Sequence, residues 1–376
     1  MEKIIQRWYD MIRINSVNGH EVDLADYVAG ELRAIGLEPR YSYFPEDRET
    51  KVRPSVWTVL DSGKPGKTVM LIGHIDTVAV ANGWNTDPFT PTEDGDKVHG
   101  LGAMDMKGGL AAILDTLEYY CQHKEAFNGR IEACFVSDEE GLSKGTYQLV
   151  EEGIGADYAI MAECRYDNVA IGFRGRFSFE VTVHGVAAHA SYYPAVGENA
   201  LITGGKLAAA IEVLPTLTHP NLKHGTWCVR YMEGGNAGTL VVPDSCYLFV
   251  DRYVVPGETE ETCIAQMAEA ARDLGLEGKV DIRLKPRSSP YMKSFALEPD
   301  DFLVTTLQAK FKEVTGGELP VAYDPSRRLR LQHPGRLPGY PHRHLRPFRR
   351  RHARCQRIRS PLAGEELRRD LQAHPG

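Results

Sequence analysis

The feature that most constrains the fold is the alternation of short apolar strands with a helix in the first half of the chain. Apolar runs at 68–72, 130–136 and 157–161 are bounded by turn-forming residues, and residues 108–121 have the composition of a buried helix. Short apolar runs of this kind are typical of strands that are buried on both faces. Strands that alternate with helices form a mostly parallel sheet flanked by helices. The sequence therefore predicts an α/β fold for this part.

The pattern changes near residue 168. Residues 177–184 and 246–254 alternate apolar and polar side chains, as antiparallel strands with one exposed face do, whereas residues 199–214 and 257–274 have helical periodicity. The order of strand, helix, strand, strand, helix and strand predicts a small two-layer α+β domain inserted into the larger one. A helix predicted over 302–315 returns the chain to the first domain.

The formal net charge of -7 is the sum of two unlike segments. The first 326 residues hold 30 Lys and Arg against 48 Asp and Glu, a net charge of -18, whereas the last 50 residues hold 14 Arg, no Lys and 3 acidic residues. A nucleic-acid binder that uses the basic tail would bind with a steep salt dependence, and the acidic body opposes this function. The total charge by itself therefore indicates no function.

Composition and targeting signals exclude several classes of protein. With 42% hydrophobic and 25% charged residues the chain is typical of globular domains, not of disordered or coiled-coil proteins. No stretch approaches the roughly 18 to 20 apolar residues that span a bilayer, and the N-terminus lacks the apolar centre of a signal peptide. The seven cysteines are scattered, which favours neither a disulfide framework nor a cysteine-based zinc site. We expect a cytoplasmic protein.

Acidic and histidine-containing segments follow the predicted strands or open the helix between them. In open parallel sheets, ligands bind at the carboxyl ends of the strands, so these side chains are expected to gather at one edge. One imidazole with several carboxylates suits Zn²⁺, Co²⁺ or Mn²⁺ better than copper. The residues concerned are His74, Asp76, Asp105, Glu139, Glu140 and Glu163.

The spacing of these residues suggests different roles. His74 and Asp76 lie two residues apart on an extended segment and share one side, so the Asp76 carboxylate could set the imidazole tautomer. Asp105, in a glycine-rich turn, could bridge two cations. Glu139 and Glu140 are neighbours in a turn and point in different directions, so that one can bind a metal while the other faces a substrate.

Each segment taken alone has a simpler interpretation. A His-x-Asp pair is often a surface hydrogen bond, and adjacent glutamates are usually solvated charges. The glycine-rich turn at 100–109 could cradle a phosphate, but it lacks the Lys-Ser/Thr ending of a P-loop and the spacing of a dinucleotide site. Their coincidence at successive strand ends of one predicted sheet favours a metal site.

The sequence resembles the acetylornithine deacetylase, succinyl-diaminopimelate desuccinylase and glutamate carboxypeptidase family of dinuclear zinc hydrolases. The resemblance covers residues 1 to about 326, with order and spacing kept throughout. The matching blocks are GHIDTV (73–78), Trp84 with DPF (87–89), GLGAMDMKGG (100–109), SDEEG (137–141), GVAAHAS (185–191) and VVPD followed by VDR (241–252).

The resemblance implies a zinc peptidase-like catalytic domain with two zinc ions per subunit, which Co²⁺ or Mn²⁺ could replace. In such a site His74 and Glu163 would hold one ion. Glu140 would hold the second together with a histidine from the C-terminal part, and Asp105 would bridge both ions. The implied reaction is hydrolysis of an amide bond in an N-acyl amino acid or a small peptide that carries a carboxylate.

The resemblance also implies roles for residues that are not metal ligands. Glu139 would be the general base, which takes a proton from the attacking water and passes it to the leaving nitrogen. Asp76 would orient the histidine ligand. His189 would be lent across a dimer interface to stabilise the oxyanion. Arg252 and Arg174 would bind the carboxylate of the substrate.

The implied organisation has four segments. Residues 1–170 and 291–326 would form the catalytic domain, and residues 171–290 an inserted domain that acts as a lid and carries a homodimer interface. Residues 327–376 form the Arg-rich tail, which we expect to be out of frame and poorly folded. Two departures from the family pattern, Ala162-Glu163-Cys164 and Leu240, leave the substrate class open.

The tail lacks the family's remaining histidine ligand, expected in a segment like MHGANE after a loop like GPSGG. Read one base forward, however, residues 351–359 are compatible with DMHGANEYV and residues 345–350 with FGPSGG. We therefore hypothesise a one-base frameshift close to Ser326, with the missing histidine due where Ala353 stands. The alternatives are a basic RNA-binding arm and a disordered extension. If the tail is real, a catalytically impaired, homodimeric carboxylate-binding protein without the second metal is the alternative function.

We predict that resequencing the gene near the codon of Ser326 will reveal a one-base insertion or deletion. Restoring the frame should place a histidine at position 353, because the recovered motif and its preceding loop both appear in one alternative frame. A gene that is unchanged on resequencing, together with tail peptides in a mass map of the purified protein, would contradict the frameshift.

Overall fold

The computed structural model describes residues 2–163, 168–323 and 355–356. Contacts between Cα atoms divide the chain into two compact units. Unit 1 comprises Met1–Asp167, Thr305–Leu319 and Pro341–Gly376, and unit 2 comprises Asn168–Val304 and Pro320–Tyr340. Each unit is described by itself. The domain boundaries expected from the resemblance stay a prediction.

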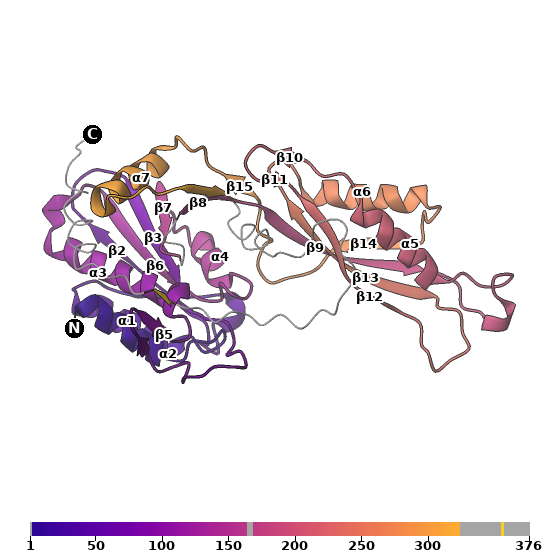
Figure 1. Cartoon of the computed structure of the whole chain (residues 1–376), viewed down its shortest axis with the longest axis horizontal. Helices are drawn as coiled ribbons and strands as arrows, with labels where there is room; N and C mark the ends of the chain where they lie inside the picture. Colours follow the sequence, from indigo (N-terminus) through magenta and orange to yellow (C-terminus); the bar gives the residue numbers. More distant parts are fainter. Residues whose placement is uncertain (1, 164–167, 324–354, 357–376) are drawn as a thin grey trace. The chain divides into compact units, whose positions relative to one another are not determined.

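Unit 1 is built on a five-stranded sheet in the order β1-β2-β6-β3-β7 (Figure 1). Strand β3 runs parallel to both of its neighbours, β6 and β7, while β1 and β2 are antiparallel additions on the far side of β6. The sheet is therefore mixed, and its parallel part consists of β6, β3 and β7. The strands are β1 (Arg40–Tyr43), β2 (Pro54–Asp61), β3 (Thr68–His74), β6 (Arg130–Val136) and β7 (Tyr158–Met161).

Helices cover both faces of this sheet, which confirms the predicted α/β class. Apolar side chains of α1 (Lys3–Arg13), α2 (Val22–Ala34) and α3 (Gly108–Gln122) pack with alternate residues of β2 and β6, such as Leu60 and Phe135. On the opposite face, Leu149 of α4 (Lys144–Glu151) packs with Ile72, Cys134 and Val136. Burial on both faces accounts for the short, continuous apolar runs of the strands.

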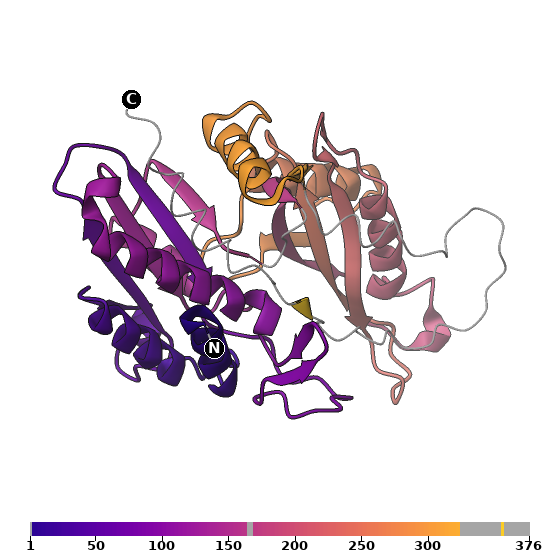
Figure 2. The same ribbon diagram turned by 60° about the vertical axis from the view of Figure 1, so that its left-hand side comes forward.

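Unit 2 is a two-layer α+β structure, as the sequence predicted. Its main sheet has the order β12-β13-β9-β14, and every neighbouring pair is antiparallel. Both α5 and α6 pack on one face of the sheet, around a core that includes Phe179, Leu248 and Met267 (Figures 1 and 2). The elements are β9 (Gly175–His184), α5 (Ala200–Glu212), β12 (Thr226–Gly234), β13 (Ser245–Val254), α6 (Glu260–Asp273) and β14 (Val280–Leu284).

Shorter elements complete the two units. A parallel and an antiparallel partner flank β8 in a three-stranded sheet of order β15-β8-β16, and β10 and β11 form a two-stranded ribbon. In unit 1, β5 pairs with β4 and with β17. The bounds are β4 (Thr92–Asp94), β5 (Lys97–His99), β8 (Val169–Phe173), β10 (Thr218–His219), β11 (Lys223–His224), β15 (Phe295–Ala296), α7 (Phe302–Thr315), β16 (Val321–Tyr323) and β17 (Cys355–Gln356).

Two further predictions concern the C-terminal tail and the location of the protein. The tail of residues 327–376, with position 353, lies outside the described residues apart from the two residues of β17. Among the described helices, none is both long enough and apolar enough to cross a membrane. The cytoplasmic location stays a prediction.

The start of α3 lies very close to the end of β7, at Gly109. A Cβ atom built on Gly109 would lie 1.9 Å from the main-chain oxygen of Ala162, whereas one built on Gly30 in α2 meets nothing within 4 Å. We predict that Gly109→Ala lowers the free energy of unfolding by about 1–3 kcal/mol, because the backbone must move to admit the methyl group. The matched control Gly30→Ala should be neutral or stabilise by up to about 1 kcal/mol. Urea unfolding of both variants tests this, and equal effects would contradict the close approach.

Candidate metal centre

The parallel strands of unit 1 bring the predicted ligands to one edge of the sheet. His74 is the last residue of β3, Glu140 follows the end of β6, and Glu163 follows the end of β7. Asp105 lies in the kinked segment Ala103–Lys107, directly before α3, and its own backbone angles are not helical. Because β6, β3 and β7 are adjacent and parallel, their carboxyl ends meet at the same edge.

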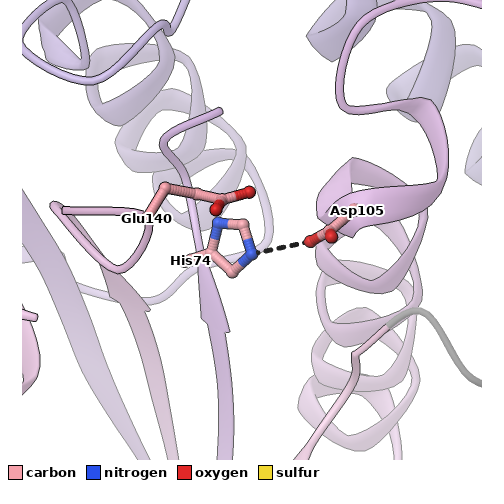
Figure 3. Close-up of side chains that lie close together, drawn as sticks. All are labelled: His74, Asp105 and Glu140. Carbon is pink, nitrogen blue, oxygen red and sulfur yellow. Dashed lines mark hydrogen bonds and ion pairs between the residues drawn. The ribbon is translucent and has the colours of Figure 1, made fainter. Parts of the chain in front are cut away.

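The side chains at this edge converge on the imidazole of His74. Nε2 of His74 lies 3.0 Å from Oδ1 of Asp105 and 3.6 Å from Oε2 of Glu163. One ligand atom from each of His74, Asp105 and Glu140 lies within 4.8 Å of the other two, and Figure 3 shows Asp105 and Glu140 approaching the imidazole from different elements. His74 is buried, whereas the side chain of Asp105 is 46% exposed, so the group is open to solvent on the carboxylate side.

The charges at this site are unbalanced without a cation. Burial by itself would lower the pKa of His74, but the hydrogen bond that its Nε2 donates to Asp105 and the charges of Asp76, Glu139 and Glu163 outweigh burial and raise the pKa to about 10. The imidazole is thus held in its protonated form by the carboxylates around it. A donor set of one imidazole and several crowded carboxylates fits a divalent metal ion, whose charge would replace that of the proton.

The two adjacent glutamates also have perturbed acidities. Burial raises the pKa of Glu140 to about 7, and the nearby charges of Asp105 and Glu139 act in the same direction. The pKa of Glu139 is likewise raised, chiefly by burial. Burial and nearby like charges raise the pKa of a carboxyl group because both favour its neutral form. Carboxyl groups with such raised pKa values are frequent in functional sites.

Asp76 contacts both the imidazole and the glutamate turn, through different atoms. Nδ1 of His74 lies 2.8 Å from the main-chain oxygen of Asp76 and 3.6 Å from its carboxylate. The Asp76 carboxylate accepts the main-chain N–H groups of Glu139 and Glu140, each at 3.0 Å. The main-chain carbonyl therefore directs Nε2 toward the ligand group, and the carboxylate holds the turn that follows β6.

The remaining predicted residues lie in unit 2. His189 is exposed, and its Nδ1 lies 2.7 Å from Oγ of Ser191 and accepts the Ser191 main-chain N–H at 3.2 Å. Arg174 is half-buried, with its guanidinium 5.1 Å from the ring centroid of Tyr253. Both side chains remain accessible to a ligand.

Arg252 differs from the expectation for a substrate-binding residue. Its side chain has no exposed surface, it pairs with Glu258, it donates to the Tyr253 main-chain oxygen at 2.7 Å, and its guanidinium lies 4.6 Å from the Trp227 ring centroid. All of these partners belong to unit 2. Because the charge is already paired inside the unit, this arrangement does not support direct contact between Arg252 and a substrate carboxylate.

Sequence reasoning missed two residues that organise the site. Asn18 donates a hydrogen bond from Nδ2 to Asp76 and another to Asp138. Asp138 in turn accepts the main-chain N–H groups of Leu142 and Lys144. Two sequence features could have pointed to these residues. Asn18 lies in the polar segment between α1 and α2, and Asp138 directly precedes Glu139 and Glu140.

Comparison with known proteins decides the family. The family model described as peptidase family M20/M25/M40 matches residues 70–327. This chain belongs to that family. A succinyl-diaminopimelate desuccinylase of Nitrosomonas eutropha is 31% identical over 280 residues, which are 70% of this chain and 71% of that protein. A protein of the same name from Rickettsia akari is 28% identical over 63% of this chain and 65% of its own length.

Solved structures share this fold. A tripeptidase from Staphylococcus aureus superposes with a TM-score of 0.68 at 20% identity, covering 85% of this chain and 83% of that one. A dinuclear metal-binding M20 peptidase from Bacillus subtilis superposes with a TM-score of 0.63 at 14% identity, covering 85% and 82%. The family resemblance and the fold class predicted from the sequence are therefore confirmed.

Glu21 is a buried carboxyl group close to Asp76. Among the described residues, its side chain is not hydrogen-bonded to any of the proposed metal ligands. Its Oε2 accepts the Gly19 main-chain N–H at 2.8 Å, while its Oε1 has no hydrogen-bond partner among the described residues. Burial raises the pKa of Glu21 from 4.5 to about 7, and the charge of Asp76 adds to the rise. The ionised form is thus disfavoured in the folded state.

This shift makes stability depend on pH. Because the folded-state pKa lies above the unfolded one, Glu21 stabilises the fold below pH 4.5, and this contribution is lost as the pH rises through about 7. We predict that Glu21→Gln raises the free energy of unfolding at pH 8 by about 1–3 kcal/mol relative to wild type, and by much less at pH 5. Urea unfolding at both pH values, with the exposed Asp23→Asn as control, measures this, and a pH-independent difference would refute it.

Proposed function

We propose that this chain is a metal-dependent hydrolase of the amide bond in N-acyl amino acids or small peptides. The observation that carries the proposal is the group of His74, Asp105 and Glu140, whose ligand atoms lie within 4.8 Å of one another in a chain of the M20/M25/M40 family. The relatives support both substrate classes, since one is named a desuccinylase and another a tripeptidase.

The proposed ligands fit a site for two ions. His74 and Glu163 would hold one ion and Glu140 the other, with Asp105 between them, because Nε2 of His74 lies within 3.6 Å of both Asp105 and Glu163. A bound Zn²⁺, Co²⁺ or Mn²⁺ would supply Lewis-acid chemistry for the water and the scissile carbonyl. The second ion also requires the C-terminal histidine that we expect at position 353, outside the described residues.

Glu139 is the proposed general base. Burial raises the pKa of its carboxyl group, which strengthens it as a base, and the nearby His74 opposes this rise. The Asp76 carboxylate accepts the main-chain N–H of Glu139 at 3.0 Å. This hydrogen bond holds the main chain of the turn and leaves the Glu139 side chain available to react. Glu139 would take a proton from the attacking water and deliver it to the leaving nitrogen.

His189 is the proposed donor to the oxyanion. Its Nδ1 accepts the Ser191 main-chain N–H, so the neutral imidazole carries its proton on Nε2 and can donate it in a hydrogen bond. In the proposal a second subunit supplies this residue. Exposed apolar side chains flank His189 in unit 2 and support an interface there, namely Val186, Tyr192, Val196, Leu240 and Val241.

The carboxylate of the substrate is assigned to Arg174 first. Arg174 is the more accessible of the two predicted arginines, and its guanidinium stacks on Tyr253, which restricts its motion. Arg252 supports this region from inside, through its pair with Glu258. A planar guanidinium binds a carboxylate through two parallel hydrogen bonds.

A second candidate function follows from the tail. The family match ends at residue 327, next to the expected frameshift, and the printed sequence beyond it lacks the MHGANE-like segment. A chain with this tail would be a catalytically impaired, homodimeric carboxylate-binding protein without the second metal. Metal analysis distinguishes the two, since two ions per subunit favour the hydrolase and one or none favours the binding protein.

We predict that Glu139→Ala lowers turnover of N-acyl amino acids or dipeptides by about 10²–10⁴-fold, because it removes the general base. Metal content should be unchanged, since Glu139 is not a proposed ligand. The assay uses the purified chain with added Zn²⁺ or Co²⁺, and the exposed Glu49→Ala serves as control. Wild-type turnover in the Glu139 variant would exclude the proposed role.

A further inference from the structure

Asn18 joins the two turns that carry the candidate site, although it lies far from both in the sequence. Its side-chain amide donates to Oδ2 of Asp76 at 3.1 Å and to Oδ1 of Asp138 at 2.9 Å. A primary amide has two N–H groups, so both can be used at once. One side chain thus connects the segment after β3 with the segment after β6.

The loop that carries Asn18 is itself held in place. The main-chain N–H of Asn18 donates to Thr77 at 3.0 Å, and the Thr77 N–H donates to Ser16 at 2.9 Å. Before the loop, the buried Lys107 donates from Nζ to the main-chain oxygen of Ile14 at 2.8 Å. These contacts place the amide between the two carboxylates without any contribution from a metal.

The first carboxylate controls the main chain of the glutamate pair. Asp76 is fully buried, and its two oxygens accept the N–H groups of Glu139 and Glu140 at 3.0 Å each. Asn18 contacts Oδ2, the same oxygen that accepts from Glu140. A shift of this carboxylate would therefore move both glutamates.

The second carboxylate closes the same turn from its other side. Asp138 has a positive φ of 61°, and its Oδ2 accepts the N–H groups of Leu142 at 3.2 Å and Lys144 at 3.3 Å. Its Oδ1 receives the Asn18 amide. Asp138 thus shapes the turn that presents Glu139 and Glu140, and Asn18 holds Asp138 relative to Asp76.

Among the described residues, the cationic side chains near these two carboxylates are not in close contact with them. Nδ1 of His74 lies 3.6 Å from Oδ1 of Asp76. Nε of Arg53 lies 3.9 Å from Oδ1 of Asp138, and the same guanidinium pairs with Asp47 at 3.0 Å. The uncharged amide of Asn18 lets Asp76 and Asp138 approach a common partner. An aspartate at position 18 would remove both donors and add a third like charge at the same place.

We propose that Asn18 is a positioning residue for Glu139 and Glu140, acting through Asp76 and Asp138. This proposal rests on the proposed function only for the roles of Glu139 and Glu140. The hydrogen bonds of Asn18 do not depend on those roles. With Asn18 in place, the turn holds its geometry before a metal ion binds. Without it, Glu140 must be reordered on binding, and the affinity for the ion falls.

The test compares Asn18→Asp with Asn15→Asp in the full-length chain. Asn15 lies in the same loop and is exposed, and its Oδ1 accepts the Val17 N–H at 3.1 Å, a role that an aspartate retains. Two quantities are measured. Hydrogen exchange with mass spectrometry follows the peptides that cover residues 137–144, and Co²⁺ titration gives the affinity of the site to which Glu140 contributes a ligand.

We expect Asn18→Asp to speed exchange in peptides 137–144 by about tenfold or more and to weaken Co²⁺ binding by about 10- to 100-fold. Peptides from α3 and β13 should exchange as in wild type, and Asn15→Asp should change neither quantity. Asn18→Ala, which removes the donors without adding charge, should show the same changes to a smaller extent and serves if Asn18→Asp does not fold.

Wild-type exchange in residues 137–144 of both Asn18 variants would overturn the proposal, as would faster exchange spread evenly over unit 1, which would indicate general destabilisation. The result is independent of catalysis. A wild-type chain that binds Co²⁺ and hydrolyses no substrate would contradict the proposed function, while local exchange confined to this turn would still support the role of Asn18.

Discussion

The site depends on the parallel pairing of β3 with its two neighbours. His74 pairs with Val136 of β6, and Ile72 pairs with Met161 of β7, so the three strands end within a few residues of one another. Parallel pairing brings to one edge three strands whose last residues are His74, Val136 and Met161, far apart in the sequence. An antiparallel neighbour would place its carboxyl end at the opposite edge and leave His74 without the carboxylates that surround it.

The second constraint is the electrostatic repulsion between the carboxylates of the site. Uncharged hydrogen-bond donors around them offset this repulsion. Among the described residues, the nearest cationic nitrogens to the Asp76 and Asp138 carboxylates, of His74 and Arg53, lie 3.6 and 3.9 Å away, while the carboxylates accept hydrogen bonds from main-chain N–H groups and from the Asn18 amide. Such donors stabilise a carboxylate without neutralising it. The site therefore keeps a net negative charge, which a divalent cation can balance, and the turn keeps its shape before the cation arrives.

The sequence predicted correctly the elements that have a clear hydrophobic periodicity. Strand ends, the helix that starts at Gly108 and the two-layer unit 2 were predicted from periodicity, because burial acts on each element separately. The interpretation of Arg252 shows the opposite case. Arg252 lies on the same buried face of β13 as Leu248 and Val250, so the alternation along the strand could have indicated that it is buried. Its ion pair with Glu258 could not be predicted in this way, because it depends on how the chain turns back after β13.

By itself, the sequence determined the fold class, the family and the types of side chain available to a metal, because strand periodicity and local motifs are short-range properties. Only the tertiary structure decided which atoms meet. It showed that His74 is hydrogen-bonded to the main-chain carbonyl of Asp76, with the Asp76 carboxylate 3.6 Å away, and that Asn18 connects Asp76 with Asp138. These contacts join loops from three separate segments, and the packing of the helices and strands beneath them, which no local pattern encodes, sets their distances.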